Sequence, residues 1–168
     1  MFLIAALIIV LDQLTKWLVV SNLDFSEIWS PWDWLTPFAR IIYWQNTGVA
    51  FGLLQGMNTV FIILGIIVSA GIIYFYPSIA KQDWLIRLAL SMELGGAIGN
   101  LIDRFKYGHV VDFISVGKFP VFNIADSCIT VGMFVLLLGV WVQEHREKKV
   151  QVSLQADPDV TTDGTDID

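Results

Sequence analysis

The sequence is short of charge. Only 15% of its 168 residues are Asp, Glu, Lys or Arg, 55% are hydrophobic, and the mean hydropathy is +0.65. Average soluble domains carry about 25% charged residues, whereas residues 41–80 contain none at all. This composition excludes an ordinary soluble domain and a disordered chain, and it indicates a membrane protein.

Several other signatures are missing. A single cysteine, Cys128, excludes an internal disulfide framework, and no Cys/His cluster has the spacing of metal ligands, so we expect no metal and no cofactor. Basic residues cluster only at 146–149, which does not indicate nucleic-acid binding. Gly-x-Ser-x-Gly and His-Glu-x-x-His are absent, and the lack of a phosphate-binding glycine loop argues against ATP-driven work.

Four segments have the roughly 20 mostly apolar residues that a membrane-spanning helix needs. The predicted spans cover about residues 2–20, 58–76, 84–101 and 127–143. The first lacks a preceding basic segment and a cleavage signature, so we interpret it as a span and not as a signal peptide. Four spans put both termini on one side, and the basic residues that follow the last span favour the cytoplasm.

The connection between the first two spans, Ser21–Met57, is long and rich in tryptophan. It contains four of the seven Trp residues, namely Trp29, Trp32, Trp34 and Trp44. Because Trp prefers the headgroup layer, we expect this segment to lie on the outer membrane surface. Ile41–Trp44 and Val49–Phe51 have strand-like composition and predict a small β-containing region. The alternative is an aromatic anchor with no further role.

The last residues differ from the rest. Positions 150–168 hold five acidic residues and no Lys or Arg, while residues 1–149 carry 10 basic and 11 acidic residues. The segment is polar and lacks periodicity, which predicts disorder. The expected organisation is therefore one membrane domain, residues 1–149, with a disordered acidic tail at 150–168.

Charged residues inside spans are costly, at about 2.5–3.5 kcal/mol each near mid-bilayer, and need a partner or a purpose. Asp12 and Lys16 are four residues apart, which puts them on one helix face within pairing distance. A structural ion pair and a catalytic pair are both open readings of these two residues. Glu93 has no partner that the sequence identifies, and we assign it no role.

Polar residues are densest between Gly95 and Asp126. The run Gly95–Gly99 offers a small-residue face for close helix packing. Asn100 and Asp103 share a helix face, and Arg104 follows. Asp112 lies just past the third span and Asp126 opens the fourth, so two antiparallel helices would bring these carboxylates together at the outer membrane boundary.

Two neighbouring carboxylates suit amide hydrolysis. They do not both ionise easily, so one keeps a proton and the pair titrates as a unit. The ionised member can take a proton from water while the protonated member donates to the carbonyl oxygen. The alternative for Asp126 is structural, because Asp at a helix start caps free N–H groups.

Five short motifs occur in order, and together they resemble lipoprotein signal peptidase, also called signal peptidase II, a family of bacterial membrane aspartic peptidases. The matching stretches are Asp12–Lys16, Asn46–Phe51, Gly99–Arg104, Val111–Phe113 and Phe122–Asp126. They cover about residues 10–143 on a four-span scaffold. The expected fold is therefore an all-α integral membrane protein with four transmembrane helices, a small extracytoplasmic β-containing cradle and a surface segment between spans 1 and 2.

The resemblance implies an activity and a set of site residues. Family members remove the signal peptide from diacylglyceryl-modified prolipoproteins, cutting just before the lipidated cysteine, and the Trp-rich segment would be a cradle or lid over that substrate. The family's catalytic dyad corresponds to Asp112 and Asp126. Its supporting residues correspond to Asp12, Lys16, Asn46, Gly48, Asn100, Asp103, Arg104 and Asn123.

The resemblance also implies a setting. We expect a monomer in the bacterial cytoplasmic (inner) membrane, with both termini cytoplasmic and the active site near the outer face. Family members need no metal and are inhibited by the cyclic peptide globomycin. The rival hypotheses are a small transporter or proton conductor, with Asp12, Lys16, Glu93, Asp103 and Asp126 as its relay, and a scaffold whose polar residues only hold helices together.

Overall fold

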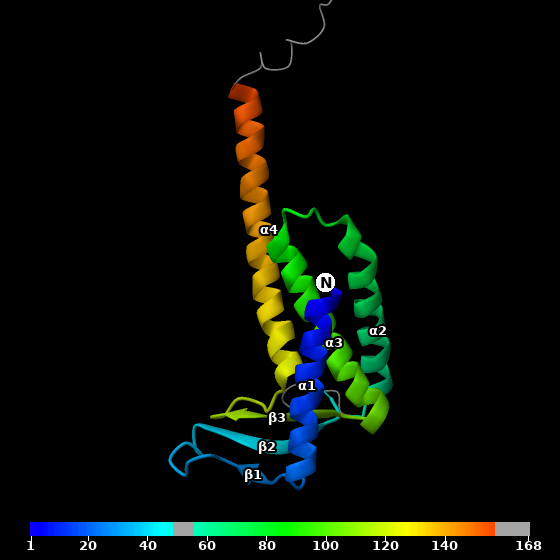
Figure 1. Ribbon diagram of the computed structural model, residues 1–168, viewed down its shortest axis with the longest axis vertical. Helices are drawn as coiled ribbons and strands as arrows, with labels where there is room; N and C mark the ends of the chain where they lie inside the picture. The colour runs from blue at the N-terminus through cyan, green and yellow to red at the C-terminus, as the bar shows by residue number, and fades with distance from the viewer. Residues whose placement is uncertain (49–55, 157–168) are drawn as a thin grey trace, which may run out of the picture.

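Four long helices and one small sheet make up the part of the protein that the computed structural model describes, residues 1–48 and 56–156 (Figure 1). The helices are α1 (Phe2–Asn22), α2 (Asn58–Phe75), α3 (Trp84–Tyr107) and α4 (Ile124–Ala156), and a short 3-10 turn, η2 (Tyr76–Ser78), extends α2. Each of the four is long and apolar enough to cross a membrane. The prediction of a four-span helical membrane protein is confirmed.

Helix α3 runs six residues beyond the predicted span. Its last turn contains Arg104 and Lys106, basic residues that favour the negative end of the helix dipole. The helix ends at Gly108, which adopts a left-handed conformation with φ of 76°. The apolar run ends before Asp103 and Arg104, but the helix continues past them. Asp103 and Arg104 therefore lie on the same helix as Asn100.

Helix α4 also outlasts its predicted span. It runs to Ala156, so residues 150–156 are helical where the sequence predicts disorder; residues 157–168 of the same tail lie outside the described residues. Gln143 donates a 3.0 Å hydrogen bond to Glu147 one turn later, the kind of polar pair that supports a helix in water. The charged run after the span is therefore a continuation of the helix.

The sheet has three antiparallel strands in the order β1 (Ile28–Trp29), β2 (Ala39–Asn46) and β3 (Val110–Val116). The predicted strand at Ile41–Trp44 is confirmed within β2, whereas Val49–Phe51 lies outside the described residues. Strand β3 was not predicted. Its pairing places Trp44 opposite Asp112 and Asn46 opposite Val110. The sheet lies at the end of the bundle opposite the N-terminus and the α2–α3 connection (Figure 1).

Small residues bring the helices close together around α3. A Cβ on Gly96 would lie 2.6 Å from the carbonyl oxygen of Ala125 on α4, and a Cβ on Gly99 would lie 2.7 Å from Asp12 Oδ2 on α1. Contacts this short are open only to glycine. The predicted small-residue face is confirmed, and it sets α1 and α4 on either side of the part of α3 that carries Asn100 and Asp103.

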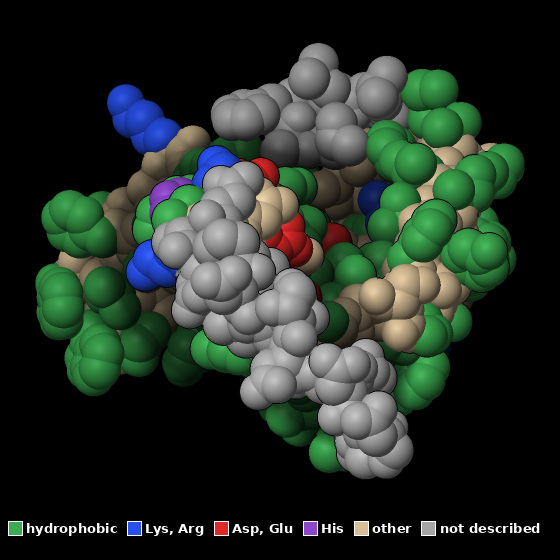
Figure 2. All heavy atoms as spheres, turned by 90° about the horizontal axis from the view of Figure 1, so that it is seen from above, with side chains coloured by type: hydrophobic (Ala, Val, Ile, Leu, Met, Phe, Trp, Pro, Cys, Tyr) green, Lys and Arg blue, Asp and Glu red, His purple; other side chains and the backbone are tan. Residues whose placement is uncertain are grey.

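The outer faces of the helices are apolar. Large hydrophobic side chains such as Leu3, Ile67 and Phe134 are more than half exposed, as expected for surfaces that meet lipid. Hydrophobic side chains occupy most of the periphery in Figure 2, and the visible acidic side chains lie toward the middle. The buried polar groups therefore form a cluster inside an apolar shell.

Candidate active site

The structure brings all ten predicted site residues into one region, where the sheet meets the helix bundle. They come from five elements that are far apart in the sequence: Asp12 and Lys16 from α1, Asn46 from β2 with Gly48 just after it, Asn100, Asp103 and Arg104 from α3, Asp112 from β3, Asn123 just before α4, and Asp126 in its first turn.

Three buried charges lie at the centre of this region. Lys16 Nζ is 2.8 Å from Asp12 Oδ2 and 2.8 Å from Asp103 Oδ2, and the three side chains are at most 3% exposed. The predicted ion pair of Asp12 and Lys16 is confirmed, with Asp103 as a third member. Ion pairs removed from water need complete hydrogen bonding to be tolerated, and Lys16 Nζ makes a further bond of 3.0 Å to Asn100 Oδ1.

The carboxylates of this triad hold the backbone on which the predicted dyad is built. Asp12 Oδ1 accepts a 2.9 Å hydrogen bond from the Ala125 N–H, and Asp103 Oδ2 accepts a 3.1 Å bond from the Val111 N–H. Ala125 precedes Asp126, and Val111 precedes Asp112. Asp12 and Asp103, which both pair with Lys16, thus hold the start of α4 and the start of β3 in place.

Gln13 belongs to this cluster, and it was missed as a site residue. Its Nε2 donates to Asp103 Oδ1 at 2.9 Å and to the Gly99 carbonyl oxygen at 3.1 Å. The available signal was its place inside the Asp12–Lys16 motif, next to a buried aspartate. By bonding Asp103, Gln13 links α1 to α3 independently of Lys16.

Asp112 is almost completely buried, with 1% of its surface exposed. Its Oδ2 accepts a 2.9 Å hydrogen bond from Asn46 Nδ2, and its Oδ1 accepts a 2.8 Å bond from Asn123 Nδ2. Burial raises the pKa of Asp112 to about 7, and the negative charge of Asp126 adds to the rise. The carboxyl therefore exchanges its proton near neutral pH.

Asp126 does two things in the first turn of α4. Asn123 and Asp126 bond reciprocally: the Asp126 N–H donates to Asn123 Oδ1 at 2.8 Å, and the Asn123 N–H donates to Asp126 Oδ2 at 3.3 Å. This is a capping box, so the structural reading of Asp126 holds for one of its oxygens. The other, Oδ1, accepts a 2.8 Å bond from Asn100 Nδ2.

Two asparagines join the two carboxyl groups. Asn123 Nδ2, besides donating to Asp112, donates to Asn100 Oδ1 at 3.1 Å, and Asn100 in turn donates to Asp126. Both amides are buried. A continuous hydrogen-bonded path therefore runs from Asp112 through Asn123 and Asn100 to Asp126.

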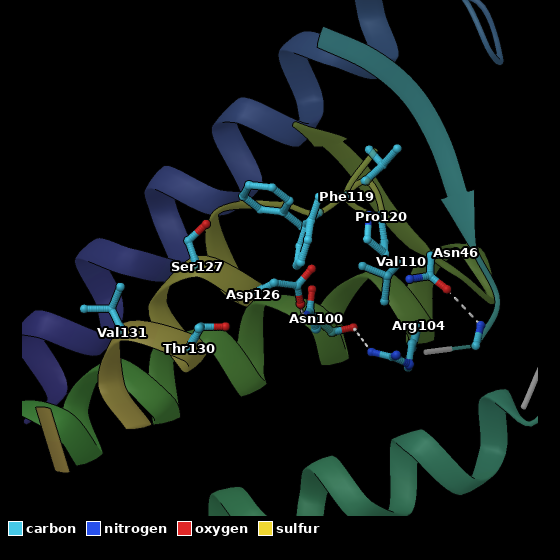
Figure 3. Close-up of a pocket in the computed structure, with 13 residues that line it drawn as sticks. Asn46, Asn100, Arg104, Val110, Phe119, Pro120, Asp126, Ser127, Thr130 and Val131 are labelled. Carbon is cyan, nitrogen blue, oxygen red and sulfur yellow. Dashed lines mark hydrogen bonds between the residues drawn. The ribbon is translucent and has the colours of Figure 1, made fainter. Parts of the chain in front are cut away.

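A pocket of about 500 Å³ opens beside this path (Figure 3). Its polar wall is formed by Asn46, Gly48, Asn100, Arg104 and Asp126, and its remaining lining residues are Val110, Phe119, Pro120, Val121, Phe122, Ser127, Thr130 and Val131. Asp126 lies on the pocket wall, whereas Asp112 does not line the pocket. Such a cavity, apolar with a few convergent polar groups, is typical of a ligand site.

Most of the apolar lining was not predicted. Phe119 closes the turn after β3, where its N–H donates to the Val116 carbonyl oxygen at 2.9 Å, and Phe122 pairs with Ile114 at the sheet edge. Ser127 and Thr130 follow Asp126 by one and four residues on α4, and the spacing of Thr130 alone would have placed it on the same helix face as Asp126.

No three His, Cys, Asp or Glu side chains of residues 1–48 and 56–156 lie close enough together to share a metal ion.

Together, four apolar helices and a largely apolar pocket with a few polar groups at the sheet end are typical of a multi-pass membrane enzyme. The fold matches a bacterial membrane enzyme solved at 2.3 Å with a TM-score of 0.74 and 29% identity, over 99% of this chain and 93% of that chain. A second bacterial membrane enzyme, solved at 1.9 Å, matches with a TM-score of 0.74 and 34% identity, over 83% of this chain and 90% of that chain.

Sequence relatives identify the family. Residues 4–142 match the family model described as signal peptidase (SPase) II. The lipoprotein signal peptidase of Shouchella clausii is 43% identical over 152 residues, covering 88% of this chain and 97% of that protein. That of Bacillus subtilis is 40% identical over 158 residues, covering 89% and 98%. The chain belongs to the signal peptidase II family, which confirms the resemblance and indicates a lipoprotein signal peptidase, a membrane hydrolase.

Proposed function

We propose that this protein is an aspartic endopeptidase that removes the signal peptide from diacylglyceryl-modified prolipoproteins and cuts just before the lipidated cysteine. The family supplies the general activity, and the carboxyl pair supports the mechanism. The observation that carries it is the hydrogen-bonded path between Asp112 and Asp126, which lies beside a pocket at the membrane boundary.

In this mechanism Asp126 is the base and Asp112 the acid. The raised pKa of Asp112 favours the proton on that residue, while Asp126 lies on the pocket wall where a water molecule can reach it. Asp126 takes a proton as the water oxygen bonds to the scissile carbonyl carbon, and Asp112 donates its proton to the carbonyl oxygen. Because Asp112 is 1% exposed, this step requires the pocket wall to open toward it when substrate binds.

Collapse of the tetrahedral intermediate completes the reaction. The C–N bond breaks, the proton held by Asp126 passes to the leaving amine of the lipidated cysteine, and Asp112 recovers its proton as the carbonyl re-forms. Asn46 and Gly48 lie at the end of β2 beside the pocket, where they can bind substrate backbone. No step uses a metal ion or a cofactor.

The charge distribution supports an orientation. The sheet end of the molecule suits the outer headgroup layer, because Trp29 of β1 and Trp32 and Trp34 of the β1–β2 connection are more than half exposed. The opposite end carries Lys81, Arg87 and the basic turns after the last span, which suits the cytoplasm. We therefore place both termini in the cytoplasm and the pocket at the outer face of the bacterial inner membrane, where a lipidated substrate enters sideways from the bilayer.

The transporter reading has less support. A relay across the membrane needs polar groups along its whole depth, and Glu93 is the member nearest the far side. It lies ten residues from Asp103, about 15 Å along the helix axis, and its buried Oε1 has no hydrogen-bond partner in the described residues. The polar groups gather at one end, as a hydrolase at the membrane boundary requires.

The test is cleavage of a diacylglyceryl-modified prolipoprotein by purified protein in detergent. We expect Asp112→Asn and Asp126→Asn each to abolish cleavage, globomycin to inhibit the wild type, and the exposed Asp33→Asn to cleave normally. Full activity in either dyad variant would remove the assignment. Proton flux through liposomes that contain the protein would instead support the transporter.

A further inference from the structure

Helix α2 is the one span that contributes no residue to the proposed mechanism. Its first turn nevertheless contacts Arg104 on the pocket wall. Two contacts join its side chains to the pocket residues within the described part of the chain, and both are made to Arg104. Asn58 Nδ2 donates to the Arg104 carbonyl oxygen at 3.4 Å, and Arg104 Cζ lies 5.1 Å from the centre of the Phe61 ring.

Arg104 has few other partners. It lines the pocket, but it makes no salt bridge with any described residue, and its hydrogen bond to the Asn100 carbonyl oxygen is long at 3.5 Å. A guanidinium at the membrane boundary is costly unless something stabilises its charge. An aromatic face within about 6 Å does so without neutralising the charge.

We infer that Phe61 is a positioning residue for the hydrolysis: its ring face holds the Arg104 guanidinium at the pocket wall, beside the carboxyl pair. A carboxylate partner would hold Arg104 equally well but would cancel its field. The Phe61 ring fixes the guanidinium and leaves its positive charge available to the pocket. This inference rests on the proposed function for its pH dependence but not for the contact itself.

The charge of Arg104 acts on several groups. The carboxyl groups that face it are Asp126 from α4, Asp112 from β3 and Asp103 from α3, and the cation that faces the pair from α1 is Lys16. Lys16 is held by its two ion pairs and stays when Phe61 changes. Losing a fixed Arg104 therefore makes the carboxyl pair harder to ionise, and both limbs of the pH–rate profile move to higher pH.

The first experiment compares purified full-length variants on a diacylglyceryl-modified prolipoprotein. Phe61→Leu keeps the side chain apolar but removes the ring face, and we expect kcat/KM to fall by about two- to thirtyfold with both pH limbs shifted upward. Phe61→Tyr keeps the ring and should retain most activity. Phe75→Leu, the same substitution at the far end of α2 where Phe75 is 60% exposed, is the matched control.

A double-mutant cycle separates positioning from packing. If Phe61 acts through Arg104, Phe61→Leu costs less than about twofold in an Arg104→Gln background, because the contact is already lost. The inference is overturned by wild-type kcat/KM in Phe61→Leu, by an undiminished loss in the Arg104→Gln background, or, where that background is too slow to assay, by unmoved pH limbs. The cycle uses wild-type Asp112 and Asp126, so failure of the dyad assignment is detected separately in their Asn variants.

Discussion

Asp112→Asn should stabilise the protein at alkaline pH while removing its activity. In the folded wild type, burial and the charge of Asp126 raise the pKa of Asp112 from 3.8 to about 7. Between those two values the folded state binds more protons than the unfolded state, so unfolding becomes easier as the pH rises. An asparagine never ionises, and the variant does not share this pH-dependent loss.

The size of the effect follows from the structure. The pKa of Asp112 is higher by roughly three in the folded state than in the unfolded state. At 1.36 kcal/mol per pH unit, the free energy of unfolding of the wild type falls by at most about 4 kcal/mol as the pH rises from below 3.8 to above 7. Both oxygens of Asp112 accept hydrogen bonds, from Asn46 and Asn123, and an amide can accept only one of them. The lost bond costs about 1–2 kcal/mol. By pH 5 the wild type has already lost about 1.6 kcal/mol, which offsets the lost bond. The variant should thus be less stable than wild type below about pH 4, about equally stable near pH 5, and more stable, by about 2–3 kcal/mol, near pH 8.5.

Thermal unfolding in detergent, followed by the fluorescence of the seven Trp residues, measures this difference. At about 2–4 °C per kcal/mol for a chain of this size, the Tm of the variant should be close to that of the wild type at pH 5 and higher by about 4–12 °C at pH 8.5. Asp33→Asn, which removes an exposed carboxyl group, should show no such pH-dependent increase in Tm relative to the wild type. A Tm difference that stays constant across this range would refute the assignment of a near-neutral pKa to Asp112.

Three further predictions concern the buried triad and the absence of a metal. Lys16→Met leaves Asp12 and Asp103 unpaired at almost zero exposure, so Tm should fall by about 6–20 °C, with partial recovery when both acids also become Asn; an unchanged Tm would contradict a role for the triad in stability. Gly99→Ala puts a Cβ 2.7 Å from Asp12 Oδ2 and should reduce both Tm and cleavage, whereas Gly71→Ala, with no atom within 4 Å, should not. EDTA should leave the cleavage rate unchanged; a loss that added metal reverses would require another mechanism.

The features that could be predicted from the sequence are those encoded over short distances. The spans follow from apolar runs, and the Asp12–Lys16 pair follows from one helical turn of spacing. The third member of the triad did not follow, because Asp103 lies on α3 and meets Lys16 only after α1 and α3 pack together. Nothing in the local sequence says which of several acids will face a given lysine.

Strand β3 was missed for a similar reason. Its partner is β2, and the pair that joins Asn46 to Val110 spans 64 residues. Five of the seven β3 residues are buried, including Asp112 and Ser115 between apolar neighbours, so the alternation of buried and exposed positions that marks a half-exposed strand is absent. Asp112 was therefore expected in a connection past the third span. Its place in β3 brings Asp112 within hydrogen-bond distance of Asn46 on β2 and of Asn123.

The position of Lys16 explains how a cation can lie at the centre of the site while Asp112 keeps its proton. A lysine bonded directly to Asp112 would hold that carboxyl ionised and leave the proposed reaction without its acid. Lys16 is instead bonded to Asp12 and Asp103 at 2.8 Å each, and its hydrogen-bonded link to the carboxyl pair runs through the Asn100 amide. Its charge lowers the pKa of Asp112 by less than burial and the charge of Asp126 raise it. The two acids of the triad also accept hydrogen bonds from the Val111 and Ala125 N–H groups, which fixes the position of the carboxyl pair. The same buried charges can therefore stabilise the fold while the burial of Asp112 sets its pKa.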